Sequence, residues 1–158
     1  MAKTPPDRTV VATNRRARRD YEILDTYECG MVLRGSEAKS LREAKVQIAD
    51  AYGRIRSNEM WVMGVHISPY SHSSPVFGHD PDRARKLLLH RHEIDRIRAK
   101  TDLERLSLVP LSIYFREGYA KLELGVAKGR RQYDKRQAIR KRETDLEARK
   151  AMSVRRHR

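Results

Sequence analysis

The excess positive charge of this chain is confined to its two ends. Residues 128–158 contain 13 Lys and Arg against 4 Asp and Glu, and residues 1–19 contain 6 against 1. Residues 20–127 contain 16 of each sign, although the whole chain carries +14. A neutral segment of this length can bury a core, whereas the ends are too polar to fold alone. We predict a flexible basic arm over 1–19, a globular domain over 20–127 and a basic tail over 128–158.

This layout favours a polyanion, above all nucleic acid, as the partner of both ends. A membrane surface is the weaker alternative, because the tail lacks the apolar face of an interfacial helix. Cys29 is the single cysteine, which leaves no disulfide framework and no cysteine metal cluster. The sequence has no apolar run of membrane-spanning length and no secretory signal, so we expect a cytoplasmic protein with no membrane partner.

Five stretches of the neutral segment are predicted to be β-strands from their apolar patterns. The last two form a hairpin across residues 116–118, and the second of these alternates between apolar and polar positions. Gly30 is expected to mark a bulge or bend. Together they predict a mainly β fold, a small antiparallel OB-type β-barrel with short flanking helices. The strands are Tyr21–Leu33, Val46–Ile55, Met60–Ile67, Leu106–Phe115 and Tyr119–Val126.

Two helices and a long loop are predicted between these strands. The stretch from Ser36 to Ala44 fits a short helix with Ser36 as its N-cap. Residues 68–81 form a loop, and a second helix opens at Asp80-Pro81. Leu88 falls outside the apolar stripe of that helix, so it is either a core residue beside a kink or an exposed contact for RNA or protein. The stripe comprises Leu87, Ile94, Ile97 and Thr101.

The two basic ends have different patterns. The cluster from Asn14 to Arg19 suits phosphate contact, and its alternative is a solvated lead-in to the first strand. In the tail, Ile139 and Leu146 form an apolar stripe too sparse to stabilise a helix in water, although the composition favours helix. We expect a coil when free and a helix in an anionic groove; a disordered solubility tail is the alternative. Gly129 would supply a hinge, and Tyr133 a surface for base stacking.

No constellation for catalysis or metal binding is evident. His90 and His92 are two residues apart on a predicted helix and should not face each other. His72 and His79 share a loop that offers no Cys and no close Glu. The sequence contains no Walker-type Gly-Lys-Ser/Thr loop, no nucleophile elbow and no His-Glu-x-x-His motif. We expect no enzyme activity, no metal and no cofactor, and we expect the isolated carboxylates to be solvated: Glu37, Glu43 and Glu59.

Several ordered segments resemble the small protein B (SmpB) family, which binds transfer-messenger RNA (tmRNA, or SsrA RNA) in trans-translation. The resemblance covers about residues 14–142. The segments are Asn14-Arg15-Arg16-Ala17 with Tyr21, Glu28-Cys29-Gly30, residues 35–42 (GSEAKSLR), Ile67-Ser68-Pro69-Tyr70, residues 79–89 (HDPDRARKLLL), Val109-Pro110-Leu111, Ala127-Lys128-Gly129 and Asp134-Lys135-Arg136.

This resemblance implies an OB-type barrel that binds the tRNA-like domain of tmRNA and delivers it to stalled ribosomes. It also implies a tail that is helical on the ribosome, in the decoding centre and the empty mRNA channel. Elongation factor Tu would join the delivery complex, and the protein would be a monomer. The tmRNA-binding residues would be Asn14, Arg15, Arg16, Tyr21, Glu28, Gly30, Lys39, Arg42, Arg83, Lys86 and Leu88. The ribosome-binding residues would be Lys128, Gly129, Arg130, Arg131, Tyr133, Asp134, Lys135 and Arg136.

Two positions depart from the family pattern. Cys29 stands where Ala is usual, and Tyr133 stands where His is common, so a charged imidazole is not available there. On an RNA-facing surface, Glu28 would accept hydrogen bonds from base amino or 2′-hydroxyl groups. Two other functions are weighed against this one: an RNA-cleaving enzyme that uses His79 or His92, and a structural ribosomal protein.

Overall fold

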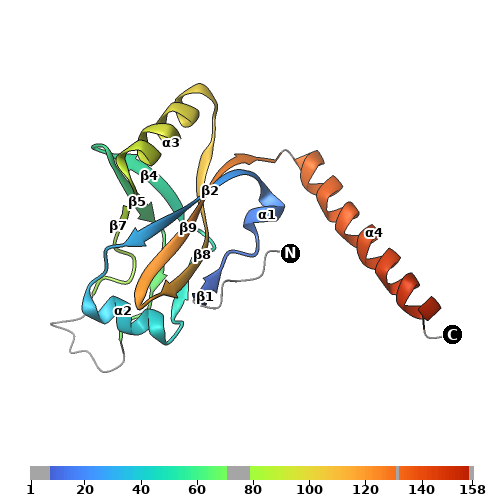
Figure 1. Ribbon diagram of the computed structural model, residues 1–158, viewed down its shortest axis with the longest axis horizontal. Helices are drawn as coiled ribbons and strands as arrows, with labels where there is room; N and C mark the ends of the chain where they lie inside the picture. Colours follow the sequence, from blue (N-terminus) through green and yellow to red (C-terminus); the bar gives the residue numbers. More distant parts are fainter. Residues whose placement is uncertain (1–7, 71–78, 131, 157–158) are drawn as a thin grey trace.

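Strands from both ends of the domain close a ring of antiparallel β-structure (Figure 1). The computed structural model describes residues 8–70, 79–130 and 132–156. The ring runs β8-β4-β5-β7-β2-β9 and closes where β9 pairs with β8; β1 adds to the outer edge of β8. Its members are β1 (Arg8–Thr13), β2 (Tyr21–Met31), β4 (Tyr52–Arg56), β5 (Glu59–Met63), β7 (Arg85–Leu88), β8 (Ser107–Arg116) and β9 (Tyr119–Gly129). The prediction of a mainly β, antiparallel fold is confirmed.

Four helices and a second, two-stranded sheet complete the fold. The small sheet pairs β3 (Val46–Gln47) with β6 (His66–Ile67). Helices α2 and α3 lie at opposite ends of the ring (Figure 1), and each inserts a fully buried side chain, Leu41 or Ile97, into the main core. The helices are α1 (Ala17–Asp20), α2 (Gly35–Arg42), α3 (Arg91–Leu103) and α4 (Gln132–Arg156). No helix in the described ranges is long and apolar enough to cross a membrane.

The hairpin of β8 and β9 follows the predicted alternation, except near its open end. Leu122, Leu124 and Val126 are fully buried, as predicted. The opposite face is exposed at Tyr119 but buried at Gly125, where α1 packs from outside. Strand β8 has a bulge between Pro110 and Ser112, and the extra residue, Leu111, packs on Gly125 from outside. A second, outer core forms there from Ala17, Val109, Leu111 and Ala127.

The N-terminal arm is a strand from Arg8 onward, so the expected boundary at residue 19 is wrong. Arg8–Thr13 pairs with β8 in a register that places Arg8 opposite Arg116 and Thr13 opposite Ser112. Apolar and polar residues do not alternate regularly in this stretch, so the strand could not be predicted from the sequence. Asn14 then donates from its backbone N–H to the Leu111 carbonyl at 2.8 Å and from Nδ2 to the Pro110 carbonyl at 3.1 Å. Residues 1–7 lie outside the described part of the chain.

Other predicted elements are divided or displaced. The strand predicted over residues 46–55 is split between β3 and β4, and the one over 60–67 is split at Gly64, whose φ is +77°. The helix predicted from Asp80 begins only at Arg91, because Arg85–Leu88 is a strand between β5 and β2. Three consecutive leucines at 87–89 are compatible with a helix or with a strand. The segment forms a strand because β7 is needed between β5 and β2 to close the ring.

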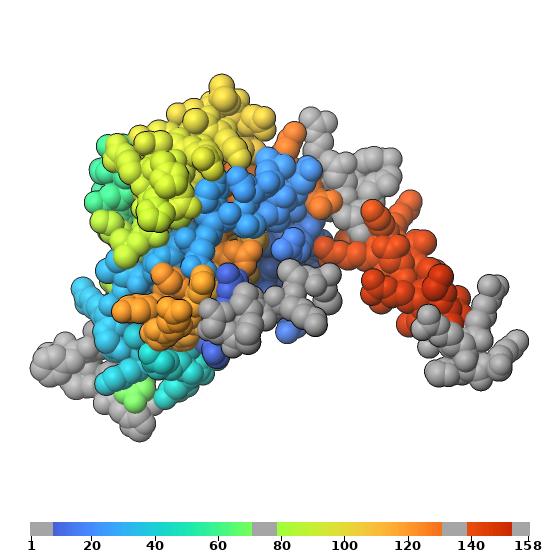
Figure 2. Space-filling model, viewed as in Figure 1, coloured from blue at the N-terminus to red at the C-terminus, as the bar shows by residue number. Residues whose placement is uncertain are grey.

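Helix α4 is formed in the structure, whereas the sequence predicts a coil for the free tail. It stands clear of the barrel in Figures 1 and 2, and its described side chains from Ile139 to Met152 are exposed. Leu146 is 54% exposed and Met152 is 68% exposed. The strong helix formers of the tail therefore set the backbone conformation over residues 139–152 without tertiary packing there, although α4 also contacts α1.

Gly53 permits the single point at which β4 meets β8, so its replacement should weaken ring closure. Gly53 pairs with Leu108, and a Cβ on Gly53 would lie 2.8 Å from the Leu108 Cβ. We expect Gly53→Ala to lower the free energy of unfolding by about 1–3 kcal/mol, measured by urea denaturation.

Gly35→Ala is the matched control, because a Cβ there meets nothing within 4 Å. In the first turn of α2 the new alanine should be neutral or stabilising by about 0.5–1 kcal/mol. Equal stability of the two variants would contradict the importance of the β4–β8 crossing.

Candidate nucleic-acid interface

A row of paired residues crosses the outer face of five strands. Leu88 of β7 lies opposite Gly30 of β2, which lies opposite Lys121 of β9. Lys121 in turn lies opposite Tyr114 of β8. Neighbouring strands are about 4.8 Å apart, so a row from β7 to β1 extends about 19 Å. This length suits contact with a nucleic-acid backbone rather than with a single small molecule.

Leu88 is exposed, so it is not the core residue that the sequence left open as one alternative. Its side chain is 53% exposed, beside the main-chain surface of Gly30. Gly30 is not a bulge, because it pairs in register on both sides. Instead it permits close approach, since a Cβ there would lie 3.3 Å from the Leu88 Cβ. A half-exposed leucine over a flat strand is a suitable contact for a base or a sugar.

Glu28 lies two residues before Gly30, at the centre of a polar network. Its carboxylate accepts hydrogen bonds from the Tyr114 hydroxyl, from Arg116 Nη1 at 3.2 and 3.3 Å, and from Arg8 Nη2 at 3.3 Å. The Arg8 guanidinium lies 4.4 Å from the centre of the Tyr114 ring. Both carboxylate oxygens are therefore engaged within the protein. Glu28 therefore fixes the positions of two arginines, and its direct contact with RNA stays a prediction.

The electrostatics of the network keep Glu28 ionised. Burial alone raises the pKa of Glu28, but the hydrogen bond from Tyr114 and the charges of Arg116 and Arg8 outweigh it, so that the pKa is lowered. Burial and the hydrogen bond to Glu28 raise the pKa of Tyr114. Tyr114 consequently remains a neutral donor. We define the sheet-face surface as Arg8, Glu28, Gly30, Leu88, Tyr114, Arg116 and Lys121, within which Tyr114 is only 1% exposed and lies beneath the Arg8 guanidinium.

Four of these residues are absent from the prediction. Lys121 occupies the polar phase of the second predicted strand, so that alternation could have indicated it. Arg116 is predicted in the turn, and no face is predicted for Tyr114. Arg8 could not be found, because the sequence gives no clear strand before residue 14. Of the predicted residues, Lys86 also points outward on β7 and pairs with Glu59 at 3.2 Å.

Arg83 is predicted to bind RNA, but its guanidinium is committed to a buried ion pair. Glu37 of α2 is fully buried and accepts from Arg83 Nη2 at 2.5 Å and from Arg85 Nε at 2.5 Å. Its Oε1 also accepts from the Arg34 backbone N–H at 2.8 Å, which makes Arg34 rather than Ser36 the N-cap. The expectation that Glu37 is solvated is therefore wrong. This ion pair joins α2 to β7.

The histidines that the sequence leaves open have structural partners in the described residues. His79 is 6% exposed, with Nε2 2.9 Å from the Ile67 carbonyl and Nδ1 2.9 Å from Ser36 Oγ. Nε2 therefore carries the proton, and Nδ1 accepts from the serine. His90 and His92 do face each other, contrary to expectation, because their rings stack with centres 5.4 Å apart. His72 lies outside the described residues.

The remaining predicted residues lie away from the sheet-face surface. In α2, Lys39 lies over the Tyr70 ring at 5.4 Å, and Arg42 lies over Phe115 at 4.7 Å. Asn14 is 8% exposed and holds the chain on β8. Tyr21 is the first residue of β2 and pairs with Gly129, next to Lys128 and Arg130, whereas Arg15 and Arg16 precede α1. Arg131 lies outside the described chain, as do the side chains of Tyr133, Asp134, Lys135 and Arg136, whose backbone is helical in α4.

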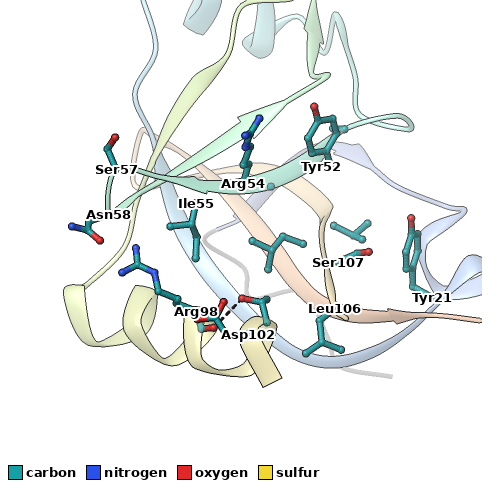
Figure 3. Close-up of a pocket in the computed structure, with 15 residues that line it drawn as sticks. Tyr21, Tyr52, Arg54, Ile55, Ser57, Asn58, Arg98, Asp102, Leu106 and Ser107 are labelled. Atoms are coloured by element: carbon teal, nitrogen blue, oxygen red, sulfur yellow. Dashed lines mark hydrogen bonds between the residues drawn. The ribbon is translucent and has the colours of Figure 1, made fainter. Parts of the chain in front are cut away.

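A cleft of about 690 Å³ lies between β4, α3 and the start of β8 (Figure 3). Ile55 of β4, Arg98 and Asp102 of α3, and Leu106 and Ser107 line it. Tyr21 also belongs to its wall and to that of a neighbouring cavity of about 460 Å³. The cleft arises because β4 and β8 pair at one position only. In the described residues no group of three or more His, Cys, Asp or Glu side chains could hold a metal ion.

Comparison with known proteins agrees with this geometry. Residues 11–154 match the family described as SmpB protein. The chain belongs to the SmpB family. It is 51% identical over 148 residues to an SsrA-binding protein of Leifsonia xyli, with 94% of this chain and 93% of the relative covered. It is 48% identical over 146 residues to one from Thermosynechococcus vestitus, with 92% and 96% covered.

A solved structure shows the same fold. The structure, described as "tmRNA-SmpB: a journey to the center of the bacterial ribosome", has 47% sequence identity to this chain and a TM-score of 0.65. The match covers 82% of this chain and 94% of the other. The family resemblance seen in the sequence is confirmed, and with it the mainly β fold.

The buried Glu37 leads to a prediction about stability and its dependence on pH. Glu37→Gln leaves Arg83 and Arg85 without a counter-charge and should cost about 3–5 kcal/mol in urea unfolding. Burial raises the pKa of Glu37, but the Arg83, Arg34 and Arg85 hydrogen bonds lower it overall. A carboxylate whose pKa is lower in the folded than in the unfolded protein stabilises the fold when the pH is above its unfolded pKa, about 4.3 for Glu. That stabilisation is lost as the pH falls through the folded pKa.

The substitution should therefore flatten the loss of unfolding free energy between about pH 5 and pH 3. Glu43→Gln, at the residue that follows α2, is the control, because Glu43 is exposed and pairs only with Lys45 at 3.2 Å in the described contacts. We expect a change below about 1 kcal/mol for that variant. Similar small effects of both substitutions would show that the Glu37 pair does not hold α2.

Proposed function

We propose that this protein binds the tRNA-like domain of tmRNA and delivers it to stalled ribosomes for trans-translation. The observation that carries the proposal is the sheet-face surface: an exposed leucine over Gly30, flanked by Lys121 and by arginines fixed on Glu28. Fixed cations suit phosphates, and the apolar centre suits bases or sugars. The names of the relatives and of the solved structure support the same partner.

The proposal assigns the tail to the ribosome. Helix α4 projects from the barrel and offers exposed cations along its described length. A basic helix with this little apolar surface suits an rRNA-lined channel, where counterion release favours binding. Lys128, Gly129, Arg130, Arg131, Tyr133, Asp134, Lys135 and Arg136 would enter the decoding centre and the empty mRNA channel. Action as a monomer in the cytoplasm, with elongation factor Tu in the delivery complex, rests on the family resemblance.

An adaptor is favoured over an RNA-cleaving enzyme by the state of His79. Both ring nitrogens of His79 hold the loop to α2 and β6, and neither is available as a general base in the described structure. A structural ribosomal protein would remain on ribosomes through a high-salt wash. The proposed adaptor should dissociate from them and appear with free RNA.

Replacing Leu88 tests the tmRNA site. We expect Leu88→Ala to weaken binding to the isolated tRNA-like domain at least fivefold in a filter-binding or fluorescence assay, without lowering the melting temperature. Leu24→Ala is the matched control, because Leu24 is similarly exposed, at 47%, and lies toward the other end of β2 from Gly30. Equal affinities of the two variants would remove the sheet-face surface from the proposal.

Truncation separates the two activities. A chain that ends at Gly129 should bind the tRNA-like domain nearly as well as the full chain, but should fail to tag peptides on stalled ribosomes in vitro. Parallel loss of both activities would contradict the division between barrel and tail.

A further inference from the structure

Strands β4, β5 and β7 lie side by side in the ring, and their outer face carries a tryptophan between two cations (Figure 1). The register places Trp61 of β5 opposite Arg54 of β4 on one side and opposite Lys86 of β7 on the other. The Cβ atoms of such paired residues lie about 5 Å apart on the same face of a sheet. We define the Trp61 platform as Arg54, Trp61 and Lys86.

The platform faces away from the core. Met60 and Val62, on either side of Trp61, are fully buried, whereas Trp61 itself is only half-buried. Arg54 is exposed, and its side chain leaves β4 on the opposite side from Ile55 (Figure 3). A tryptophan that served only the core would point inward with Met60 and Val62. The indole of Trp61 is instead accessible to a partner from outside.

A cavity of about 170 Å³ lies beside Trp61. Its lining includes the apolar side chains of Trp61, Met63 and Ala84 and the charged side chains of Arg56 and Glu59. Sites for free small molecules measure about 300–1,000 Å³, so this cavity is too small for a free cofactor. It suits one planar ring that belongs to a longer chain, and an aromatic face is a stacking surface for any nucleobase.

The charges around Trp61 favour a polyanion. Arg54, Arg56 and Lys86 are cations, and Glu59 is the one carboxylate among the residues of the platform and the cavity. Lys86 Nζ lies 3.2 Å from Glu59 Oε1, which orients the lysine beside the indole. RNA offers a base to the indole and phosphates to the cations at the same time.

The platform continues the sheet-face surface. Lys86 and Leu88 lie on one face of β7, about 6.6 Å apart, and Trp61 lies one strand further. The main chains at Trp61 and Leu88 are therefore about 8 Å apart, a distance that neighbouring nucleotides of an unpaired strand can span. The next pair along β4 and β5, Tyr52 with Met63, carries no cation, so the platform ends at its own row.

We propose that the Trp61 platform stacks an unpaired base of the tRNA-like domain, beside the nucleotide that contacts Leu88, and that Arg54 and Lys86 bind the flanking phosphates. The inference rests on the proposed function and extends its RNA site from β7 onto β5 and β4. It adds Trp61 and Arg54 to the residues that the family resemblance implies. It also gives Lys86 a specific partner, the phosphate on one side of the stacked base.

The fluorescence of the unchanged protein gives the first test, because Trp61 is the only tryptophan of the chain. The full chain is titrated with the isolated tRNA-like domain, and the emission and its quenching by acrylamide are followed. A stacked base should change the emission and shield the indole, so that the acrylamide quenching constant falls at least twofold at saturation. Unchanged emission together with an unchanged quenching constant would overturn the inference.

Two substitutions separate stacking from packing. Trp61→Leu and Trp61→Phe both keep an apolar side chain on β5, but only Phe keeps an aromatic face. We expect the Leu variant to bind the tRNA-like domain at least about fivefold more weakly, and the Phe variant to stay within about twofold of the unchanged protein. Equal affinities of two folded variants would contradict stacking. If the Leu variant does not fold, the fluorescence titration decides.

A double substitution tests the cations of the platform. Arg54→Gln with Lys86→Gln should reduce the log–log salt slope of binding by about 0.7–0.9 for each phosphate that is no longer neutralised. Arg96→Gln with Arg105→Gln is the matched control, because both arginines are exposed and lie outside the platform and the sheet-face surface. Its slope should equal that of the unchanged protein. Equal slopes of the two double variants would contradict phosphate binding by the platform.

Leu88→Ala distinguishes failure of this inference from failure of the proposed function. If Leu88→Ala weakens binding while Trp61→Leu and the emission of Trp61 have no effect or change, the RNA site ends at β7 and only this inference is wrong. If neither substitution alters the affinity for the tRNA-like domain, the sheet-face surface is not its site, and the observation that carries the proposed function is lost.

Discussion

The pairing of β2 with β9 is the interaction on which the rest of the structure depends. It runs from Tyr21 opposite Gly129 to Gly30 opposite Lys121, interrupted by one bulge between Ile23 and Asp25. It closes the ring between β7 and β8. Its first end joins the N-terminal arginines to the tail, and its last end places Glu28 and Gly30 beside Lys121. A single long ladder therefore connects the sheet-face surface at one end of β2 with the start of the C-terminal tail at the other.

Two acidic residues, one buried and one on the surface, fix the positions of basic residues in the domain. Glu37, fully buried, binds Arg83 and Arg85 and so holds α2 on β7. Glu28, on the surface, binds Arg8 and Arg116 from two further strands. These carboxylates explain how a domain of zero net charge can still present fixed cations. Exposed cations also lie on the arginines before β2 and along α4, where they can attract an anionic partner.

The sequence predicts the hairpin, the buried phase of β9 and the family, because each rests on local pattern or on motif order. It misses β1, whose pairing to β8 is set by partners a hundred residues away. It also misplaces β7 as helix, since only ring closure distinguishes a strand from a helix at Leu87. Among site residues, Leu88 and Gly30 could be predicted, whereas the role of Glu28 could not. Its partners Arg8 and Arg116 converge only in the folded barrel.

Hydroxyl-radical footprinting of the full chain tests most directly whether the sheet-face surface binds the tRNA-like domain. Leu88 reports on that surface and is 53% exposed; Tyr52 of β4, 50% exposed, lies outside it and is the reference residue. Binding of the isolated tRNA-like domain should protect Leu88 and leave Tyr52 as reactive as in the free protein. Equal protection of both residues, or no protection of Leu88, would contradict binding of that RNA by the sheet-face surface.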